Sequence, residues 1–191
     1  MKMLHLPEFH GLEHVARAHL SVAKMFFLYA LPLSIIPPLM LYYAGTMYRG
    51  ALLLDFTSAQ LQTIGVVFFI TELVMLFAMA ALIQRIGEVI EFHPSFEDAF
   101  KLAVIAPTPL WLAPLFLFIP SFTVNLLVGP LALIAAGGLI YYSVPSVLKV
   151  EEKGHAMLLS GWICSAGMVA WAAMMYLTLL TWNAVTSSLP F

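Results

Sequence analysis

Long apolar stretches alternate with short polar segments along this chain of 191 residues. A helix needs roughly 20 mostly apolar residues to cross about 30 Å of hydrocarbon. Five stretches are long enough, and they lie at about residues 25–44, 61–83, 102–119, 122–144 and 157–182. The pattern therefore predicts an all-α membrane protein with five transmembrane helices.

The connections between these stretches are short. Only Pro120 and Ser121 separate the third stretch from the fourth, so these two helices should form a tight antiparallel hairpin. No internal repeat and no long linker divides the chain. We expect one membrane domain over residues 23–191, preceded by a cytoplasmic segment at residues 1–22.

Prolines interrupt the first and third stretches. They are Pro32, Pro37 and Pro38 in the first stretch and Pro107, Pro109 and Pro114 in the third. A proline inside a helix removes a backbone hydrogen bond and clashes with the carbonyl four residues back, at a cost of about 3 kcal/mol. Both spans should therefore be kinked. Inside a membrane, the freed carbonyls need hydrogen-bond donors from the protein, and the Thr108 hydroxyl and the Trp111 indole could supply them. The kinks are either purely structural, or they open a binding cleft or form a moving gate.

Composition supports a lipid-covered protein. The chain is 62% hydrophobic and only 9% charged, whereas a soluble domain carries about 25% charged residues. The net charge of −2 and the absence of a basic patch argue against binding to nucleic acid. Cys164 is the only cysteine, so no intrachain disulfide can form and a buried structural thiol is expected.

The distribution of cations predicts how the helices are oriented. With five spans, seven of the eight Lys and Arg residues fall on the side of the N-terminus, and Arg49 alone falls on the other side. The seven are Lys2, Arg17, Lys24, Arg85, Lys101, Lys149 and Lys153. Because cytoplasmic loops carry the excess of Lys and Arg, the N-terminus should be cytoplasmic and the C-terminus outside the cytoplasm.

The segment before the first span shows a helical repeat of apolar residues. Phe9, Leu12, Ala16 and Leu20 recur at helical spacing, with polar residues on the other side. This pattern is typical of a short amphipathic helix that lies in the membrane interface.

The same segment contains an H-x-x-E-H motif at His10, Glu13 and His14. Two histidines at this spacing can hold zinc beside a carboxylate. However, a catalytic zinc needs a third protein ligand, and the other histidines lie at no recognisable spacing. Gly11 within the motif also weakens the helix that it requires. We therefore predict no metal site and no cofactor, and a zinc-dependent enzyme is a remote alternative.

Glu72 lies near the midpoint of the second span. An acidic residue there costs about 2.5 to 3.5 kcal/mol on insertion scales, so it should face the protein interior in its protonated form. One interpretation is a structural hydrogen bond to Thr71, Thr108 or Asn125. The other is a proton or cation site that lines a polar cavity.

The polar loop before the third span contains a helix-start signal. Ser95 can cap a helix while Asp98, three residues later, returns the bond. We expect Ala99 and Phe100 to face the membrane, and Asp98 and Lys101 to remain in water.

Three segments resemble the Yip-domain family of Ypt/Rab-interacting membrane proteins, and in particular its bacterial branch. They are YALPLSIIPPLMLYYAG at 29–45, FEDAFKLAVIAPTPLWLAPLFLFIP at 96–120, and YYSVPSVLKVEEKGHAM at 141–157. The second segment, with its T-P-x-W-L-A core, is the most specific. The resemblance implies a five-helix bundle in the bacterial inner membrane with a cytoplasmic N-terminus. Eukaryotic relatives are associated with small GTPases, but the chain has no long acidic N-terminal region for such contacts.

Three functions fit these observations. The first is a non-enzymatic scaffold, assembly or trafficking-like factor that binds a protein partner at the cytoplasmic face or a membrane lipid. The second is a small transporter, channel or lipid-handling protein. A polar cleft reaching Glu72 and Thr108 would favour the second function, and a solid bundle would favour the first. The zinc-dependent enzyme comes last.

Two sets of residues follow from these alternatives. The candidates for binding or gating are Glu72, Pro107, Thr108, Pro109, Trp111, Pro114 and Asn125. Homo-oligomers could form through small-residue faces at Gly137, Gly138, Gly161 and Gly167.

Overall fold

The computed structural model describes residues 21–48, 56–89 and 91–187. These residues form helices and no β-strands, and five helical stretches are long and apolar enough to cross a membrane. The all-α fold with five spans is therefore confirmed. The predicted interfacial helix, except for its last two residues, and the candidate zinc ligands His10, Glu13 and His14 lie outside the described residues.

The first span, Val22–Met47, is not one regular α-helix. It is composed of α2 (Val22–Met25), a π-helical turn η2 (Phe26–Ala30), α3 (Leu31–Ser34) and α4 (Ile36–Met47). In η2, the Leu31 amide donates to the Phe26 carbonyl five residues back. Pro32 lies two residues after this turn, so the widened turn contains the carbonyls to which the proline cannot donate a hydrogen bond.

The third span, Phe96–Phe118, is also divided. It consists of α6 (Phe96–Ile105), α7 (Thr108–Leu112) and a 3₁₀ helix η3 (Ala113–Phe118). The regular pattern is interrupted at Ala106 and Pro107, and a proline stands in the first turn of both α7 and η3. The interruptions thus coincide with the prolines, and the kinks themselves stay predictions.

The other three spans are continuous helices: α5 (Ser58–Val89), α8 (Phe122–Val147) and α9 (Lys153–Ser187). At 1.5 Å per residue, α5 and α9 are about 48 and 52 Å long, which exceeds the roughly 30 Å of the hydrocarbon core. Their polar ends therefore extend beyond the apolar stretches. On one such end of α5, Arg85 and Glu88 form a salt bridge of 2.9 Å.

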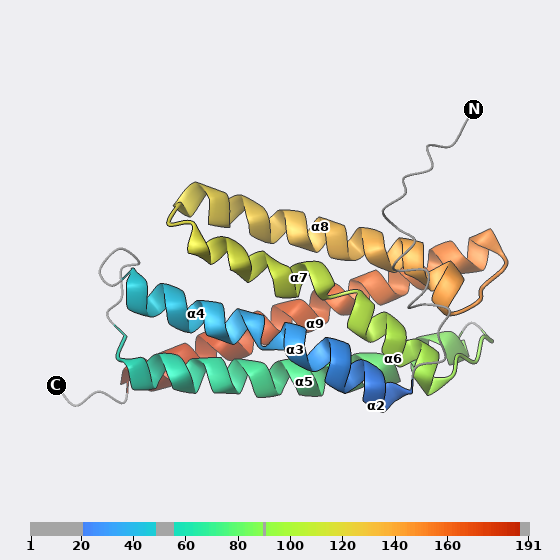
Figure 1. Cartoon of the computed structure of the whole chain (residues 1–191). Helices are drawn as coiled ribbons and strands as arrows, with labels where there is room; N and C mark the ends of the chain where they lie inside the picture. The colour runs from blue at the N-terminus through green and yellow to red at the C-terminus, as the bar shows by residue number, and fades with distance from the viewer. Residues whose placement is uncertain (1–20, 49–55, 90, 188–191) are drawn as a thin grey trace.

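Helix α5 is central, because it contacts α4, α6 and α9 (Figure 1). Its beginning meets the end of α9, where the Gln60 side-chain amide donates to the Val185 carbonyl at 3.2 Å and Phe56 contacts Trp182 edge to face. Helix α8 packs against α6, α7, η3 and α9. The third span and α8 form an antiparallel hairpin, as the two-residue connection predicts (Figure 1).

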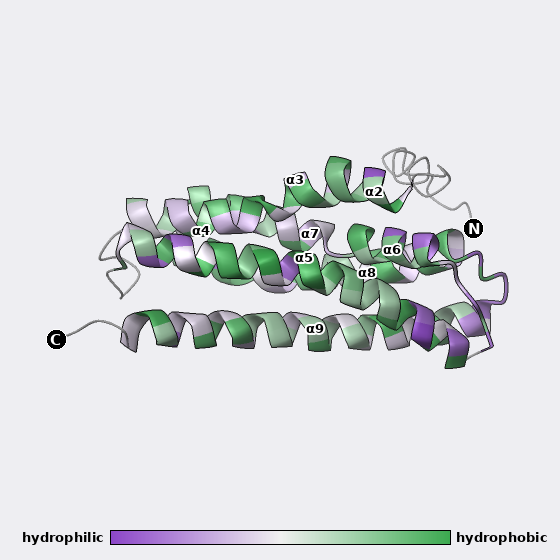
Figure 2. Ribbon diagram, turned by 90° about the horizontal axis from the view of Figure 1, so that it is seen from below, coloured by the Kyte–Doolittle hydropathy of each residue, from purple (hydrophilic) through white to green (hydrophobic). Residues whose placement is uncertain are grey.

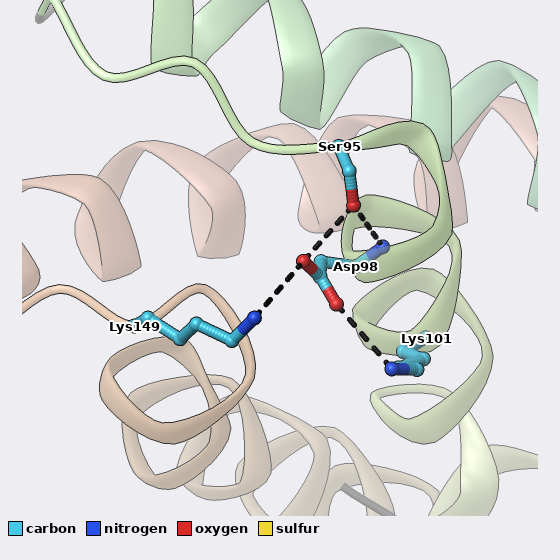
Figure 3. A network of polar contacts seen from close by, with 4 residues as sticks. All are labelled: Ser95, Asp98, Lys101 and Lys149. Atoms are coloured by element: carbon cyan, nitrogen blue, oxygen red, sulfur yellow. Dashed lines mark hydrogen bonds and ion pairs between the residues drawn. The ribbon is translucent and has the colours of Figure 1, made fainter. Parts of the chain in front are cut away.

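Helix α6 is the most enclosed part of the described chain. Every residue from Ala99 to Ile105 is buried, because α5, α2, η2 and α8 surround this helix. The expectation that Ala99 and Phe100 face the membrane and that Lys101 remains in water is therefore wrong. Lys101 is only 4% exposed, and its ammonium group contacts Asp98 Oδ1 at 3.3 Å (Figure 3).

Asp98 is the centre of a polar network at the start of α6 (Figure 3). The Ser95 hydroxyl accepts a hydrogen bond from the Asp98 amide at 3.1 Å and donates to Asp98 Oδ2 at 2.9 Å. The exposed Lys149, at the end of α8, lies 4.0 Å from the same carboxylate oxygen. This helix cap thereby connects the third span to the segment between α8 and α9.

Hydrophilic residues gather at one end of the bundle, where α2, α6 and α9 begin (Figure 2). The cations of this end include Lys24, Lys101, Lys149 and Lys153. This is the end that the charge distribution predicts to be cytoplasmic.

Candidate functional site

Glu72 and Trp111 join the second and third spans inside the bundle. The Trp111 indole N–H donates a hydrogen bond to Glu72 Oε1. Glu72 is 7% exposed and Trp111 is 1% exposed, so the contact is shielded from the surface. The other carboxylate oxygen, Oε2, is buried and has no hydrogen-bond partner among the described residues.

The partner of Glu72 differs from the three that we expected. Thr108 bonds to the first span, and Asn125 donates to the carbonyls of Ile119 and Ser121 at 3.0 and 2.9 Å, where it closes the hairpin. Trp111 takes their place because its side chain extends from α7 to Glu72 of α5. Its indole was expected to serve a freed backbone carbonyl, and it serves the carboxylate instead.

The Thr108 hydroxyl satisfies the backbone at the interruption of the third span. Pro109 has no N–H to offer the Ile105 carbonyl four residues back. The Thr108 hydroxyl donates to this carbonyl at 2.7 Å. Its single proton is then used, so the Tyr29 hydroxyl, 2.9 Å away, is the donor in the second contact of Thr108 Oγ1.

Tyr29 is a site residue that the sequence analysis missed. It belongs to η2, so the π-helical turn of the first span contacts the interruption of the third span. A second tyrosine of the first span, Tyr48, donates to the carbonyls of Leu117 and Phe118 at 3.2 Å each, at the end of η3. The irregular backbone of the third span is thus paired with protein, as a membrane interior requires. The available signal was the position of Tyr29 three residues before Pro32.

A cavity of about 260 Å³ lies beside the Glu72–Trp111 contact. Residues of α5, the third span, α8 and α9 line it, together with Pro37 of α4. Of the candidate residues, Glu72, Pro107, Trp111 and Pro114 line the cavity, whereas Thr108, Pro109 and Asn125 do not. The interruption at Pro107 therefore borders an internal space.

The cavity wall is almost entirely apolar. Among the described residues that line it, Glu72 is the only carboxylate, and none is Lys, Arg or His. Five methionines contribute to the lining: Met75, Met79, Met168, Met174 and Met175. Methionine side chains are flexible and polarisable, so such a wall adapts to ligands of different shape. These methionines were not among the candidate site residues, although Met75 and Met79 stand at helical spacing.

Three of the four glycines that we expected on outer faces lie between α8 and α9. A Cβ atom on Gly137 would lie 3.6 Å from Cys164 Sγ, and one on Gly161 would lie 3.6 Å from the Tyr141 hydroxyl oxygen. One on Gly167 would lie 4.0 Å from Ile140 Cδ1. These are ordinary van der Waals distances, so the three glycines face the neighbouring helix within one molecule, and of the four only Gly138 faces open space.

The described residues contain no group of three or more His, Cys, Asp and Glu side chains that could hold a metal ion.

Comparison with known proteins identifies one family. A model of the Yip1 domain matches residues 7–174, which is most of the chain. Neither the curated proteins nor the solved structures contain a match.

Proposed function

Because the chain belongs to the Yip1-domain family and has several membrane-spanning helices, we propose that it is a lipid-handling protein that binds a membrane lipid in the cavity beside Glu72. The cavity is the observation that carries this proposal. Its mostly apolar wall with few polar groups, among them the Glu72 carboxyl, is typical of ligand sites. The proposed activity is binding, with no catalytic step.

The position of the cavity supports a lipid rather than a water-soluble ligand. Met168 is 48% exposed at the outer surface of α9 and also lines the cavity. The wall of the cavity thus continues to a surface that faces the hydrocarbon of the membrane. An ionisable residue at this depth is by default a functional candidate, because its burial is costly.

A cavity-filling substitution tests the proposal. Ala170 lines the cavity on α9, whereas Ala172 on the same helix is exposed and does not. We expect Ala170→Phe to reduce labelling by a photoactivatable fatty-acyl lipid in nanodiscs several-fold, because the new ring occupies the binding space. Ala172→Phe is the matched control and should label like the natural chain. Equal labelling of both variants would contradict the proposal.

A scaffold or assembly factor is a second candidate, and it rests on α9. Only 6% of the most apolar part of α9 is buried, compared with 39% for the third span. Trp162, Val169 and Tyr176 recur every seven residues and are 60%, 70% and 62% exposed. This face would receive a protein partner or a second copy of the chain, while the cytoplasmic loops would add contacts.

We further propose that the protein resides in the bacterial inner membrane with a cytoplasmic N-terminus. The cations at one end of the bundle support this orientation (Figure 2). Alkaline phosphatase fused after the last span should be active in intact cells, since that enzyme folds only outside the cytoplasm. An inactive alkaline phosphatase fusion would contradict this orientation if a fluorescent reporter that works only in the cytoplasm were active at the same position.

A further inference from the structure

Only one of the two carboxyl oxygens of Glu72 has a hydrogen-bond partner among the described residues. Trp111 occupies Oε1, while Oε2 is buried without a partner among the described residues. Buried polar groups without partners are rare and costly in folded proteins. Because Glu72 lines the cavity, a ligand there can supply the missing partner.

The two protonation states of Glu72 require different partners. A protonated carboxyl donates from its O–H, whereas a carboxylate only accepts. A hydroxyl group both donates and accepts, so it can pair with Oε2 in either state. A ligand with a hydroxyl group is therefore compatible with this site whatever the charge of Glu72.

Charged headgroups do not match the cavity. A phosphate would meet no cation among the described residues, since none of those lining the cavity is Lys, Arg or His, and it would be repelled by an ionised Glu72. A metal cation such as Ca²⁺ takes six to eight oxygen ligands, and Glu72 is the only carboxylate that the described part of the chain contributes to the wall. The chemistry of the wall thus selects an uncharged polar group attached to an apolar body.

We propose that the ligand is an uncharged lipid alcohol whose hydroxyl group bonds to Glu72 Oε2 and whose chain lies against the methionine-rich wall. This inference rests on the proposed lipid-handling function and specifies the class of lipid. Trp111 is then a positioning residue, because its N–H holds Oε1 and leaves Oε2 without a partner among the described residues.

The size of the cavity limits how much of the ligand it encloses. A volume of about 260 Å³ is roughly nine times the 30 Å³ that one water molecule occupies in the liquid. The cavity therefore holds the hydroxyl group and the first several carbon atoms of a long chain. The remainder of the chain leaves past the exposed Met168 into the surrounding membrane.

Three photoactivatable probes of equal chain length test the headgroup: a primary alcohol, its phosphate monoester and the corresponding alkane. In nanodiscs, the alcohol should label the natural chain about threefold to tenfold more than the alkane, since one added hydrogen bond has an effect of this size. The phosphate should label no more than the alkane.

The variant Glu72→Leu removes the proposed partner and keeps the wall apolar. It should lower labelling by the alcohol to the level of the alkane, while labelling by the alkane persists and reports an intact cavity. Glu72→Gln should keep most of the preference, because the amide can still pair with both Trp111 and a hydroxyl group.

The outcomes separate the two proposals. Equal labelling of the natural chain by alcohol and alkane, or preferred labelling by the phosphate, would overturn the alcohol inference and leave lipid binding in place. A preference for the alcohol that survives in Glu72→Leu would overturn the role of Glu72. If no probe labels the natural chain more than Ala170→Phe, lipid binding fails and the alcohol inference fails with it.

Discussion

Glu72 and Trp111 show how single residues in this membrane protein depend on each other. The indole N–H is the partner of one carboxylate oxygen, and both side chains are nearly inaccessible from the surface. A buried group that loses its partner retains the full cost of its desolvation, whereas replacing both partners with apolar groups is nearly neutral. The contribution of this pair to stability should therefore be strongly non-additive.

The first prediction concerns this pair. Trp111→Phe should lower the free energy of unfolding by about 1–3 kcal/mol, because it leaves Glu72 buried without a donor. The double variant Trp111→Phe/Glu72→Leu should recover part of this loss, as measured by thermal unfolding in detergent. Trp162→Phe, at an exposed position of α9, is the control and should change little. Losses that simply add in the double variant would show that the two side chains do not interact.

At the scale of elements, the irregular spans depend on contacts from other elements. Tyr29 of η2 bonds to Thr108 at the interruption of the third span, and Tyr48 serves the carbonyls at the end of η3. Helix α6 depends on its surroundings in the same way, since Lys101 is buried with Asp98 as its counter-charge. Lys149 contributes less, because its side chain is 73% exposed and surface pairs are weak.

The second prediction concerns the start of α6. Asp98→Asn should destabilise the protein by about 3 kcal/mol, because Lys101 loses its counter-charge. This value is the lower end of the range for a broken buried ion pair, since Asp98 itself is partly exposed. Lys149→Met should cost less than about 1 kcal/mol. The double variant Asp98→Asn/Lys101→Met should restore much of the stability, as chemical denaturation would show. Equal effects of Asp98→Asn and Lys149→Met would contradict this account.

At the scale of the whole molecule, α9 is the least buried of the five spans, which makes it the candidate surface for association between copies. Three glycines lie at the contact between α8 and α9 within one molecule, whereas the face with Trp162, Val169 and Tyr176 is exposed. Exposed apolar residues are normal in a membrane, and only contact between copies would indicate association.

The third prediction tests that association. Cys164 is the only cysteine, so Val169→Cys in a Cys164→Ser background provides a unique thiol on the exposed face. If α9 faces pair, this variant should form disulfide-linked dimers in the membrane under mild oxidation. Thr123→Cys in the same background places a thiol at an exposed position of α8 and should remain monomeric. Monomers for both thiols would remove the support for α9 as an interface.

Some features of this protein are determined by local sequence. The length and apolarity of a segment decide whether it can cross a membrane, so the five spans could be predicted from the sequence. The Ser95 cap and the interruptions beside the prolines are also local, because they follow from hydrogen bonds over a few residues. The T-P-x-W-L-A segment likewise sufficed to indicate the family that the domain match shows.

The remaining features were decided only by the tertiary structure. The arrangement of the helices determined that the side chain of Trp111, rather than that of Thr108 or Asn125, reaches Glu72. The enclosure of α6 by four elements buried Lys101, which local polarity places in water. Tyr29 and the cavity methionines of α9 reach the site from segments distant in sequence. In a chain where nearly every helix is apolar all round, hydrophobic periodicity does not distinguish the lipid face from the protein face, so packing alone makes that choice.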